Sequence, residues 1–372
     1  MELSVPQTEI APAEFPPNLL PLLRCSRDAG PLVIGGEITS GAAGIVQARL
    51  HCGTCAAEYR IEDGIARLIQ GRLSHEDEYE MATRDAQYVS TRPGPFIPFA
   101  FGWRSELSDL LEIPPHLTEL KPSGCLVLEI GCGDGRFTIL MAQLGARILA
   151  IDFSIGALRT LAWRLLSGAA PTAYELKRRS SVGDLRGQVG LVHADASNFH
   201  VAPGSFQRAL STTPLDSRDQ RMAMYGAIAN ALTDDGRFIG SVENDDLSRR
   251  LLGLPIARRY DNGIFIQHFR SETMRREAAP YFSKLRIRPI RPRIPFIRRL
   301  PLKWATWISR AVGKMPALRQ LSEILLLRAE SPVRPPVEGV KRQGNRLTKG
   351  FFRWHMARTA AKESVWDGSE RV

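Results

Sequence analysis

The twelve-residue segment 127–138, with sequence VLEIGCGDGRFT, limits the possible folds of this chain more than any other stretch. An apolar run containing Glu129 leads into three alternate glycines, Gly131, Gly133 and Gly135, and apolar residues then recur at helical spacing. This order predicts a strand, a tight turn and the start of a helix. Glycines are expected there because the turn visits positive φ and because a Cβ atom would keep a ligand away from the backbone. The helix N-terminus would offer unpaired N–H groups to a polar ligand.

A second predicted strand, at residues 146–152, also ends in an acid. Asp152 lies 21 positions after Gly131, about where an acid binds ribose hydroxyls in a nucleotide-binding βαβ unit. The dinucleotide fingerprint has its third glycine one residue later than Gly135 and needs no acid before the first glycine. The spacing therefore departs from the dinucleotide pattern.

The glycine segment, EIGCGDG, resembles the first motif of class I S-adenosylmethionine-dependent methyltransferases. The sequence from Asp152 to Ser154 is similar to the second motif of that family, and 193–196 is similar to the third, whose acid meets the adenine amino group. Residues 232–238 are similar to the turn before the fifth strand, although Pro-Gly-Gly is commoner there. The resemblance covers roughly residues 120–290 by ordered motifs. A nicotinamide enzyme and an inactive Rossmann-like domain are the alternatives.

The resemblance implies S-adenosylmethionine as the cofactor. It implies that Glu129 orients the cofactor through its methionine end or through the loop. It also implies that Asp152 binds the ribose, that Asp195 binds the adenine and that Tyr88 covers the cofactor. The full set of cofactor-binding residues that it implies is Tyr88, Glu129, Gly131, Gly133, Gly135, Asp152, Phe153, Asp195, Ala196 and Thr212.

The core of the chain alternates predicted strands and helices between residues 121 and 290, which indicates a mostly parallel sheet covered on both faces. The expected fold is α/β, with a Rossmann-like seven-stranded methyltransferase sheet. Apolar segments at 264–269 and 284–289 are expected to complete that sheet. Residues 71–120 are expected to form a linker and pre-core helices, and Pro-rich residues 1–18 are expected to be disordered.

Residues 19–70 form a predicted small domain that carries two cysteine knuckles separated by a hairpin. The segment resembles zinc-ribbon domains that activate methyltransferases or are fused ahead of them, in which both knuckles read Cys-x-x-Cys. Here the first knuckle reads Cys25-x-x-Asp28 and the second Cys52-x-x-Cys55. Aspartate can bind zinc, so these four residues are the candidate ligands of a structural zinc ion. A ribbon that has lost its metal is the alternative, and a redox pair is less favoured.

Charge is distributed unevenly along the chain. The net charge is +11, but residues 281–372 contain 21 Lys and Arg against six Asp and Glu, so they carry +15 and the first 280 residues carry −4. This asymmetry predicts an anionic partner, RNA or a membrane surface, for the expected basic helical extension 291–372. Trp304 and Trp307 recur there at helical spacing, which suits either interfacial membrane contact or a cap packed on the core.

The start of the chain shows no secretory signal, and no apolar run approaches the roughly 18 residues of a membrane span. Five cysteines with one Cys-x-x-Cys pair do not suggest a secreted disulfide scaffold. A cytoplasmic enzyme, in contact with a membrane surface at most peripherally, is therefore expected.

The methyl acceptor is less constrained by the sequence. Residues 211–216 read STTPLD, where enzymes acting on exocyclic base amines carry Asn/Asp-Pro-Pro-aromatic, which argues against that chemistry. An oxygen or an already nucleophilic nitrogen is left, and His200, Asp216 and His268 are weak candidates for a general base. The expected acceptor is a small molecule, a glycan or a lipid-linked intermediate. An RNA methyltransferase and a non-catalytic cofactor-binding module are the alternatives.

Overall fold

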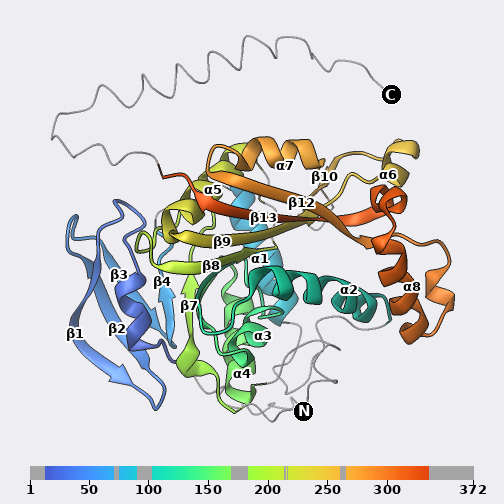
Figure 1. The fold of residues 1–372 in the computed structure, drawn as a ribbon. Coiled ribbons are helices and arrows are strands. Elements are labelled where there is room, and N and C mark those ends of the chain that lie inside the picture. Colours follow the sequence, from blue (N-terminus) through green and yellow to red (C-terminus); the bar gives the residue numbers. More distant parts are fainter. Residues whose placement is uncertain are drawn as a thin grey trace, which may run out of the picture. The chain divides into compact units, whose positions relative to one another are not determined.

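The computed structural model describes residues 13–70, 75–89, 103–168, 183–212, 215, 217–259 and 265–334. Their main sheet contains eleven strands in the order β1-β2-β3-β4-β7-β6-β5-β8-β9-β13-β12 (Figure 1). The strands are β1 Leu32–Ser40, β2 Ile45–Cys52, β3 Glu58–Glu62, β4 Ile65–Arg67, β5 Leu126–Ile130, β6 Arg147–Asp152, β7 Val189–His193, β8 Phe206–Ser211, β9 Leu232–Glu243, β12 Phe282–Pro292 and β13 Ser322–Pro332.

The helices and short elements complete the architecture. The α-helices are α1 His75–Val89, α2 Trp103–Leu120, α3 Thr138–Gln143, α4 Ile155–Ser167, α5 Arg218–Ala231, α6 Leu247–Leu251, α7 Ser271–Ala278 and α8 Leu302–Lys314. The 3₁₀ turns are η1 Pro17–Leu22, η3 Arg186–Gln188, η4 Ile297–Arg299 and η5 Pro316–Leu321. A separate two-stranded sheet pairs β10 Ala257–Arg259 with β11 Phe265–Gln267. None of the helices in the described part of the chain is long and apolar enough to cross a membrane.

The predicted α/β fold is confirmed by the central strands. β7, β6, β5, β8 and β9 pair in parallel, each neighbour with the next. β5 reads Leu-Val-Leu-Glu-Ile and is buried along its whole length, as expected for a strand with helices on both faces. All five strands therefore end at the same edge of the sheet, where ligands of open α/β sheets bind.

The predicted count of seven strands and the identity of the last strands need correction. The expected strand at 264–269 is not a strand of the main sheet, since residues 265–267 pair with β10 as β11 and Phe269 makes only an isolated bridge to Asn244 after β9. The strand between β9 and β12 is instead β13, which is antiparallel to both. Its apolar run 324–327 is buried from both faces, so it has no amphipathic alternation to mark it as a sheet strand.

Four N-terminal strands extend the sheet beyond its β7 edge. β1 to β4 form an antiparallel meander, and β4 pairs in parallel with β7. Phe15 is fully buried and exchanges backbone hydrogen bonds with Ile45. The expectation of disorder over residues 1–18 is therefore wrong for residues 13–18, because a Pro-rich composition concealed an aromatic anchor at position 15. Residues 1–12 lie outside the described part of the chain.

Two apolar layers cover the sheet, and side chains alternate between them along each strand. One layer contains η1, α5 and α7, and receives Leu128 and Ile130 of β5. The other contains α2, α3 and α4, and receives Val127 of β5. α8 lies outside α2, where Ala305 packs on Leu107.

The expected basic helical extension is only partly helical. Its described residues form η4, α8 and η5, and then β13, which lies in the main sheet between β9 and the edge strand β12. Residues 335–372 lie outside the described part of the chain.

Candidate functional site

The glycine segment crosses the carboxyl edge of the sheet between β5 and α3. Gly131, Gly133 and Gly135 have φ of 71°, 55° and 97°, all in the region that favours glycine. The N–H of Gly131 donates to the carbonyl of Ile151 at 2.8 Å, which ties the loop to the end of β6. The predicted turn with positive φ is confirmed.

The glycine loop is also fixed to α4, through packing on Leu161 and hydrogen bonds from Arg164. A Cβ atom on Gly135 would lie 2.3 Å from Leu161 Cδ1, so this glycine permits close packing of loop and helix. Arg164 of α4 donates to the carbonyl and carboxylate of Asp134. Packing alone accounts for Gly135, and its assignment to the cofactor stays a prediction.

Asp152 ends β6 directly beside this loop. Its Oδ2 accepts from the N–H of Gly133 at 2.8 Å and its Oδ1 accepts from the N–H of Ser154 at 2.8 Å. Burial raises the pKa of Asp152, and these two N–H donors oppose the rise. The carboxylate thus lies where β5 and β6 end side by side, and backbone N–H groups stabilise its negative charge. An ionised carboxylate in this place can accept strong hydrogen bonds from a pair of hydroxyls.

Glu129 lies deeper, within β5. Its side chain is 3% exposed, and its Oε2 accepts a hydrogen bond from Thr138 Oγ1 at 2.7 Å. Burial raises the pKa of Glu129 to about 8, with the nearby Asp152 charge adding to the rise and the Thr138 hydroxyl opposing it. Burial therefore favours the protonated form of this side chain, and a nearby cation would favour its ionised form.

The remaining predicted cofactor residues follow neighbouring strand ends. Asp195 and Ala196 come two and three residues after β7, and Thr212 follows β8. The carboxylate of Asp195 accepts from the N–H and the hydroxyl of Ser197, at 2.7 and 2.8 Å, in a local turn. The carbonyl of Phe153 lies 3.0 Å from His193 Nε2. The structure thus brings these residues to one edge of the sheet, and their cofactor roles stay predictions.

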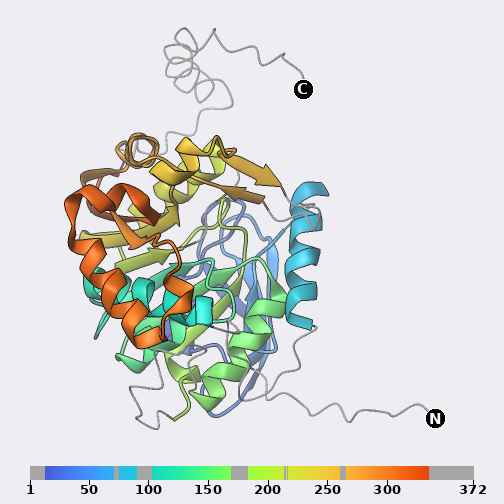
Figure 2. The ribbon, with the colours of Figure 1, turned by 90° about the vertical axis from the view of Figure 1, so that its right-hand side faces the viewer.

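Asp85 of α1 is a contributor that sequence reasoning missed. Its Oδ1 accepts from the hydroxyl of Ser154 and from the N–H of Gly156, so it caps the N-terminus of α4 beside Asp152. α1, the light-blue helix at the edge of Figure 2, is thereby attached to the candidate site. The side chain of Tyr88, farther along the same helix, lies outside the described residues.

Arg136 is a second missed residue, immediately after the glycines. Its guanidinium bridges Asp109 at 2.6 Å and Glu112 at 3.0 Å, both on α2. Arg291 of β12 reaches the other oxygen of Glu112. Burial would raise the pKa of Glu112, but the two guanidinium groups hold it below its usual value. This network fixes the start of α3 and with it the glycine loop.

The four predicted metal ligands lie together at the far edge of the sheet. One ligand atom from each of Cys25, Asp28, Cys52 and Cys55 lies within 4.8 Å of the others. Cys25 Sγ is 3.6 Å from Cys55 Sγ, and Cys52 Sγ is 3.3 Å from Asp28 Oδ1. In a tetrahedral zinc site with normal bond lengths, sulfur ligands are about 3.8 Å apart. The donor set and its spacing therefore fit zinc.

The two knuckles also share one backbone geometry. The residue after each knuckle, Ala29 or Ala56, has φ of 60° or 58° and donates its N–H to the carbonyl of Cys25 or Cys52. Backbone N–H groups of Arg27 and Thr54 point at the corresponding sulfur atoms, at 3.4 and 3.3 Å. Asp28 thus occupies in the first knuckle the position that Cys55 occupies in the second.

The weak candidates for a general base do not form a constellation. His200 is near Asp28, and its neighbour Val201 bridges to Leu23, so it lies beside the knuckles. His268 lies after β11, with its Nδ1 3.3 Å from the carbonyl of Ile256. Asp216 lies outside the described residues. No base among the described candidates is assigned by this geometry.

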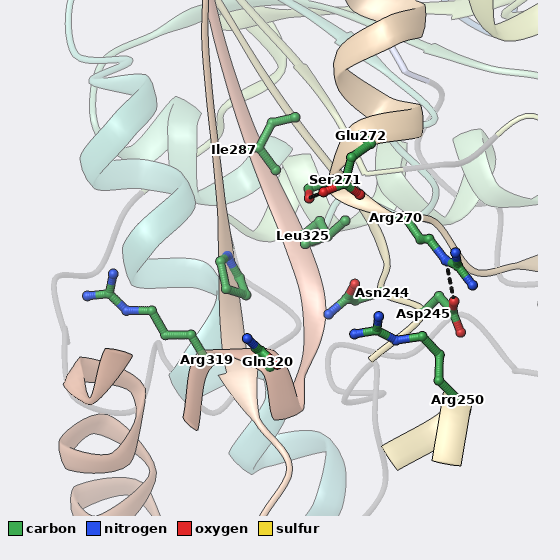
Figure 3. Close-up of a pocket in the computed structure, with 11 residues that line it drawn as sticks. Asn244, Asp245, Arg250, Arg270, Ser271, Glu272, Ile287, Arg319, Gln320 and Leu325 are labelled. Carbon is green, nitrogen blue, oxygen red and sulfur yellow. Dashed lines mark hydrogen bonds and ion pairs between the residues drawn. The ribbon is translucent and has the colours of Figure 1, made fainter. Parts of the chain in front are cut away.

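A pocket of about 410 Å³ opens at the same edge, beyond β9 (Figure 3). Asn244 and Asp245, just after β9, line one side, and apolar residues of β12 and β13 form its floor. Arg250 of α6 and Arg319 of η5 lie on opposite sides of it. Arg270 also lines the pocket and pairs with Asp245 at 3.0 Å. Sequence reasoning missed this pocket, because its residues come from five separate segments.

Comparison with known proteins agrees with the position of the candidate site. Residues 127–236, from β5 to the start of β9, match the family model described as a methyltransferase domain. Over 127 residues the chain is 28% identical to ubiquinone biosynthesis O-methyltransferase of Xanthomonas euvesicatoria pv. vesicatoria (strain 85-10), which is 34% of this chain and 46% of that protein. The chain thus spans about half the length of this curated relative.

Solved structures are similar at lower identity. An S-adenosylmethionine-dependent methyltransferase from Mesorhizobium loti superposes with a TM-score of 0.40 and 16% identity, over 61% of this chain and 99% of the other. The 1,6-didemethyltoxoflavin-N1-methyltransferase of Burkholderia thailandensis gives a TM-score of 0.39 and 17% identity, over 77% of this chain and 99% of the other.

Proposed function

We propose that this chain is an S-adenosylmethionine-dependent methyltransferase acting on an oxygen or nitrogen of a small, anionic acceptor. The observation that carries the proposal is the pairing of a glycine loop with Asp152 inside the segment that matches a methyltransferase domain. In this proposal Asp152 accepts hydrogen bonds from the ribose hydroxyls of the cofactor and Asp195 accepts one from the adenine amino group, while Glu129 faces the methionine end. Gly131 and Gly133 let the backbone approach the cofactor.

The cofactor supplies an electrophilic methyl group on a sulfonium. Methyl transfer is an in-line displacement, so the contribution of the chain is to hold the acceptor atom and the methyl group in contact. Two features support a rigid site: α1 is fixed to α4 through Asp85, and the loop is fixed to α2 through Arg136. A rigid cradle lowers the entropic part of the barrier without a dedicated base.

The pocket beyond β9 supports the acceptor class. β9 lies two strands from β5, and the spacing of strands places it about 10 Å from the glycine loop, with β13 at about 14 Å. A group held by Arg250 and Arg319 would thus be a distal part of the acceptor, not its reacting atom. Guanidinium groups bind carboxylates and phosphates in preference to neutral groups. The acceptor therefore carries an acidic group at roughly that distance from the methylated atom.

We also propose that Cys25, Asp28, Cys52 and Cys55 hold a structural zinc ion. The equivalent backbone geometry of the two knuckles supports this proposal. Three protein sulfurs and one carboxylate leave no coordination position for a substrate, so the ion has a structural role.

The experiment is calorimetric titration of the purified chain with S-adenosylmethionine and, separately, with NAD. Wild type should bind the methyl donor, and Asp152→Asn should weaken that binding at least about ten-fold, since it removes a charge-assisted acceptor. Asp235→Asn, an exposed acid in the turn at the start of β9, is the matched control and should bind like wild type. Binding of NAD, or of neither ligand, would overturn the proposal.

A further inference from the structure

Large apolar side chains are exposed mainly on one part of the surface. The described part of the chain exposes thirteen of them, and nine lie between residues 251 and 315. These nine are Leu251, Leu252, Leu254, Ile256, Phe296, Leu300, Trp304, Trp307 and Met315. Single exposed apolar residues are normal, whereas such a concentration marks an interaction site. We name the surface formed by residues 247–258 and 294–322 the apolar–basic face.

Helix α8 is oriented opposite to the usual amphipathic arrangement. It buries the small side chains of Ala305, Thr306 and Ser309 against the core. Trp304 and Trp307 point outward, 59% and 64% exposed, with their rings 6.4 Å apart. A helix that only covered the core would turn its tryptophans inward, because they bury the largest apolar area. α8 therefore packs on α2 through small residues and leaves its aromatic side exposed.

The apolar ends of α6 and α8 belong to the same side of the molecule. α6 contacts η5, and η5 follows α8 directly. Both helices lie on the right-hand side of Figure 1, which faces the viewer in Figure 2, where α8 is the long orange helix. Arg250 of α6 and Arg319 of η5 line the pocket as well, so the pocket borders the apolar–basic face.

The charge of this face selects its partner. Residues 247–258 and 294–322 contain nine Lys and Arg and no Asp or Glu. A second copy of the chain would bring like charges together across a symmetric interface. Residues 335–372 also carry a positive net charge, with eight Lys and Arg against four Asp and Glu. A complementary partner must be anionic and must also accept tryptophan and leucine side chains, and the headgroup region of an anionic bilayer meets both conditions.

We propose that the apolar–basic face docks on anionic phospholipid bilayers. Trp304 and Trp307, together with the leucines that follow α6, enter the interface between headgroups and acyl chains. Lys303, Lys314 and Arg299, which are exposed, lie on the headgroup phosphates, whereas Arg250 and Arg319 remain available to the pocket. Because the pocket borders this face, an acceptor with an acidic head and an apolar tail reaches it from the membrane; this last step rests on the proposed function.

The test is sedimentation of the full chain, treated with nuclease, with vesicles. Phosphatidylcholine vesicles containing about 30% phosphatidylglycerol should bind the chain, pure phosphatidylcholine should bind it weakly, and salt should reduce binding. Trp304→Ala/Trp307→Ala should lower the partition coefficient at least about ten-fold. Val33→Ala/Ile38→Ala removes exposed apolar groups of β1 and is the matched control, expected to bind like wild type. Circular dichroism checks that both variants fold.

A charge variant keeps the test decisive if the tryptophan variant unfolds. Lys303→Glu/Lys314→Glu, on the exposed side of α8, should also lose most binding to the anionic vesicles. Equal binding of wild type and both α8 variants would overturn the proposal, because the contact would then lie elsewhere. Failure of wild type to bind anionic vesicles, or binding to an RNA oligonucleotide alone, would overturn it too. None of these outcomes depends on methyl transfer, so the proposed function is judged separately.

Discussion

Replacement of the buried acid Glu129 by glutamine tests the electrostatics of the site most directly. Glutamine has the same shape, and its amide oxygen can accept the hydrogen bond from Thr138. The variant removes only the ability to ionise. Burial raises the pKa of Glu129 to about 8, so folding favours the protonated form. The contribution of Glu129 to the free energy of unfolding is complete below its pKa in the unfolded chain, near 4.5, and is lost as the pH rises toward 8.

The size of the effect follows from the shift in pKa. A rise from 4.5 to about 8 corresponds to at most about 5 kcal/mol, at about 1.4 kcal/mol for each pH unit. The wild-type chain loses this contribution between pH 5 and pH 8, and Glu129→Gln does not. The variant should therefore become progressively more stable than wild type over that interval, by up to several kcal/mol at the alkaline end.

The assay is urea unfolding of both proteins, without cofactor, at several pH values from about 5 to about 8.5. Glu58→Gln, which removes an exposed carboxylate of β3, is the control and should run parallel to wild type. Parallel curves for wild type and Glu129→Gln would refute the reasoning, since Glu129 would then be ionised in the folded chain. With cofactor present, the cationic methionine end should ionise Glu129, so binding at pH 7 should release a proton in wild type only.

Three further outcomes are expected. Arg221→Met should lower the free energy of unfolding by about 3–5 kcal/mol, because it leaves the buried Glu277 without the two 2.9 Å hydrogen bonds that Arg221 donates. Adding Glu277→Leu should restore most of this stability. A double variant as unstable as Arg221→Met would disprove the pairing argument. Burial lowers the pKa of His116 to about 4. Its contribution to the free energy of unfolding, roughly 3 kcal/mol, is therefore present above pH 6.5 and lost as the pH falls toward 4. In His116→Gln the free energy of unfolding, measured by urea unfolding, should depend less on pH over that interval. Cys52→Ser should remove one bound zinc, measured by plasma mass spectrometry, and lower the melting temperature, whereas Cys125→Ser should keep the metal.

Local sequence patterns predicted the parts of the site that depend on neighbouring residues. Glycines at 131, 133 and 135 need positive φ whatever surrounds them, and Asp152 ends a strand in the apolar pattern of 146–152. The knuckle ligands were predictable for the same reason. Each pair spans one tight turn, and equal spacing gives equal geometry.

The contacts that connect distant segments could not be predicted in this way. Asp85 caps a helix 71 residues later in the chain, and Glu112 binds an arginine 179 residues away. Charged residues on a helix usually face solvent, so nothing in their own neighbourhood marks them as buried partners. β13 was missed because its continuous apolar run 324–327 lies after a basic, Pro-rich stretch that looked like an extension.

The N-terminal strands change how the candidate site must be understood. In a seven-stranded sheet β7 would be an exposed edge, which invites pairing with other chains. Here β4 covers that edge through the pairs Ile65 with Leu191 and Ala66 with Val192, and Leu68 donates to the carbonyl of His193 at 2.9 Å. Two residues after His193 comes Asp195, the proposed adenine acid. The N-terminal strands, which hold the knuckles at their far end, therefore also fix one end of the proposed cofactor site, so metal binding and cofactor binding are expected to stabilise the same sheet.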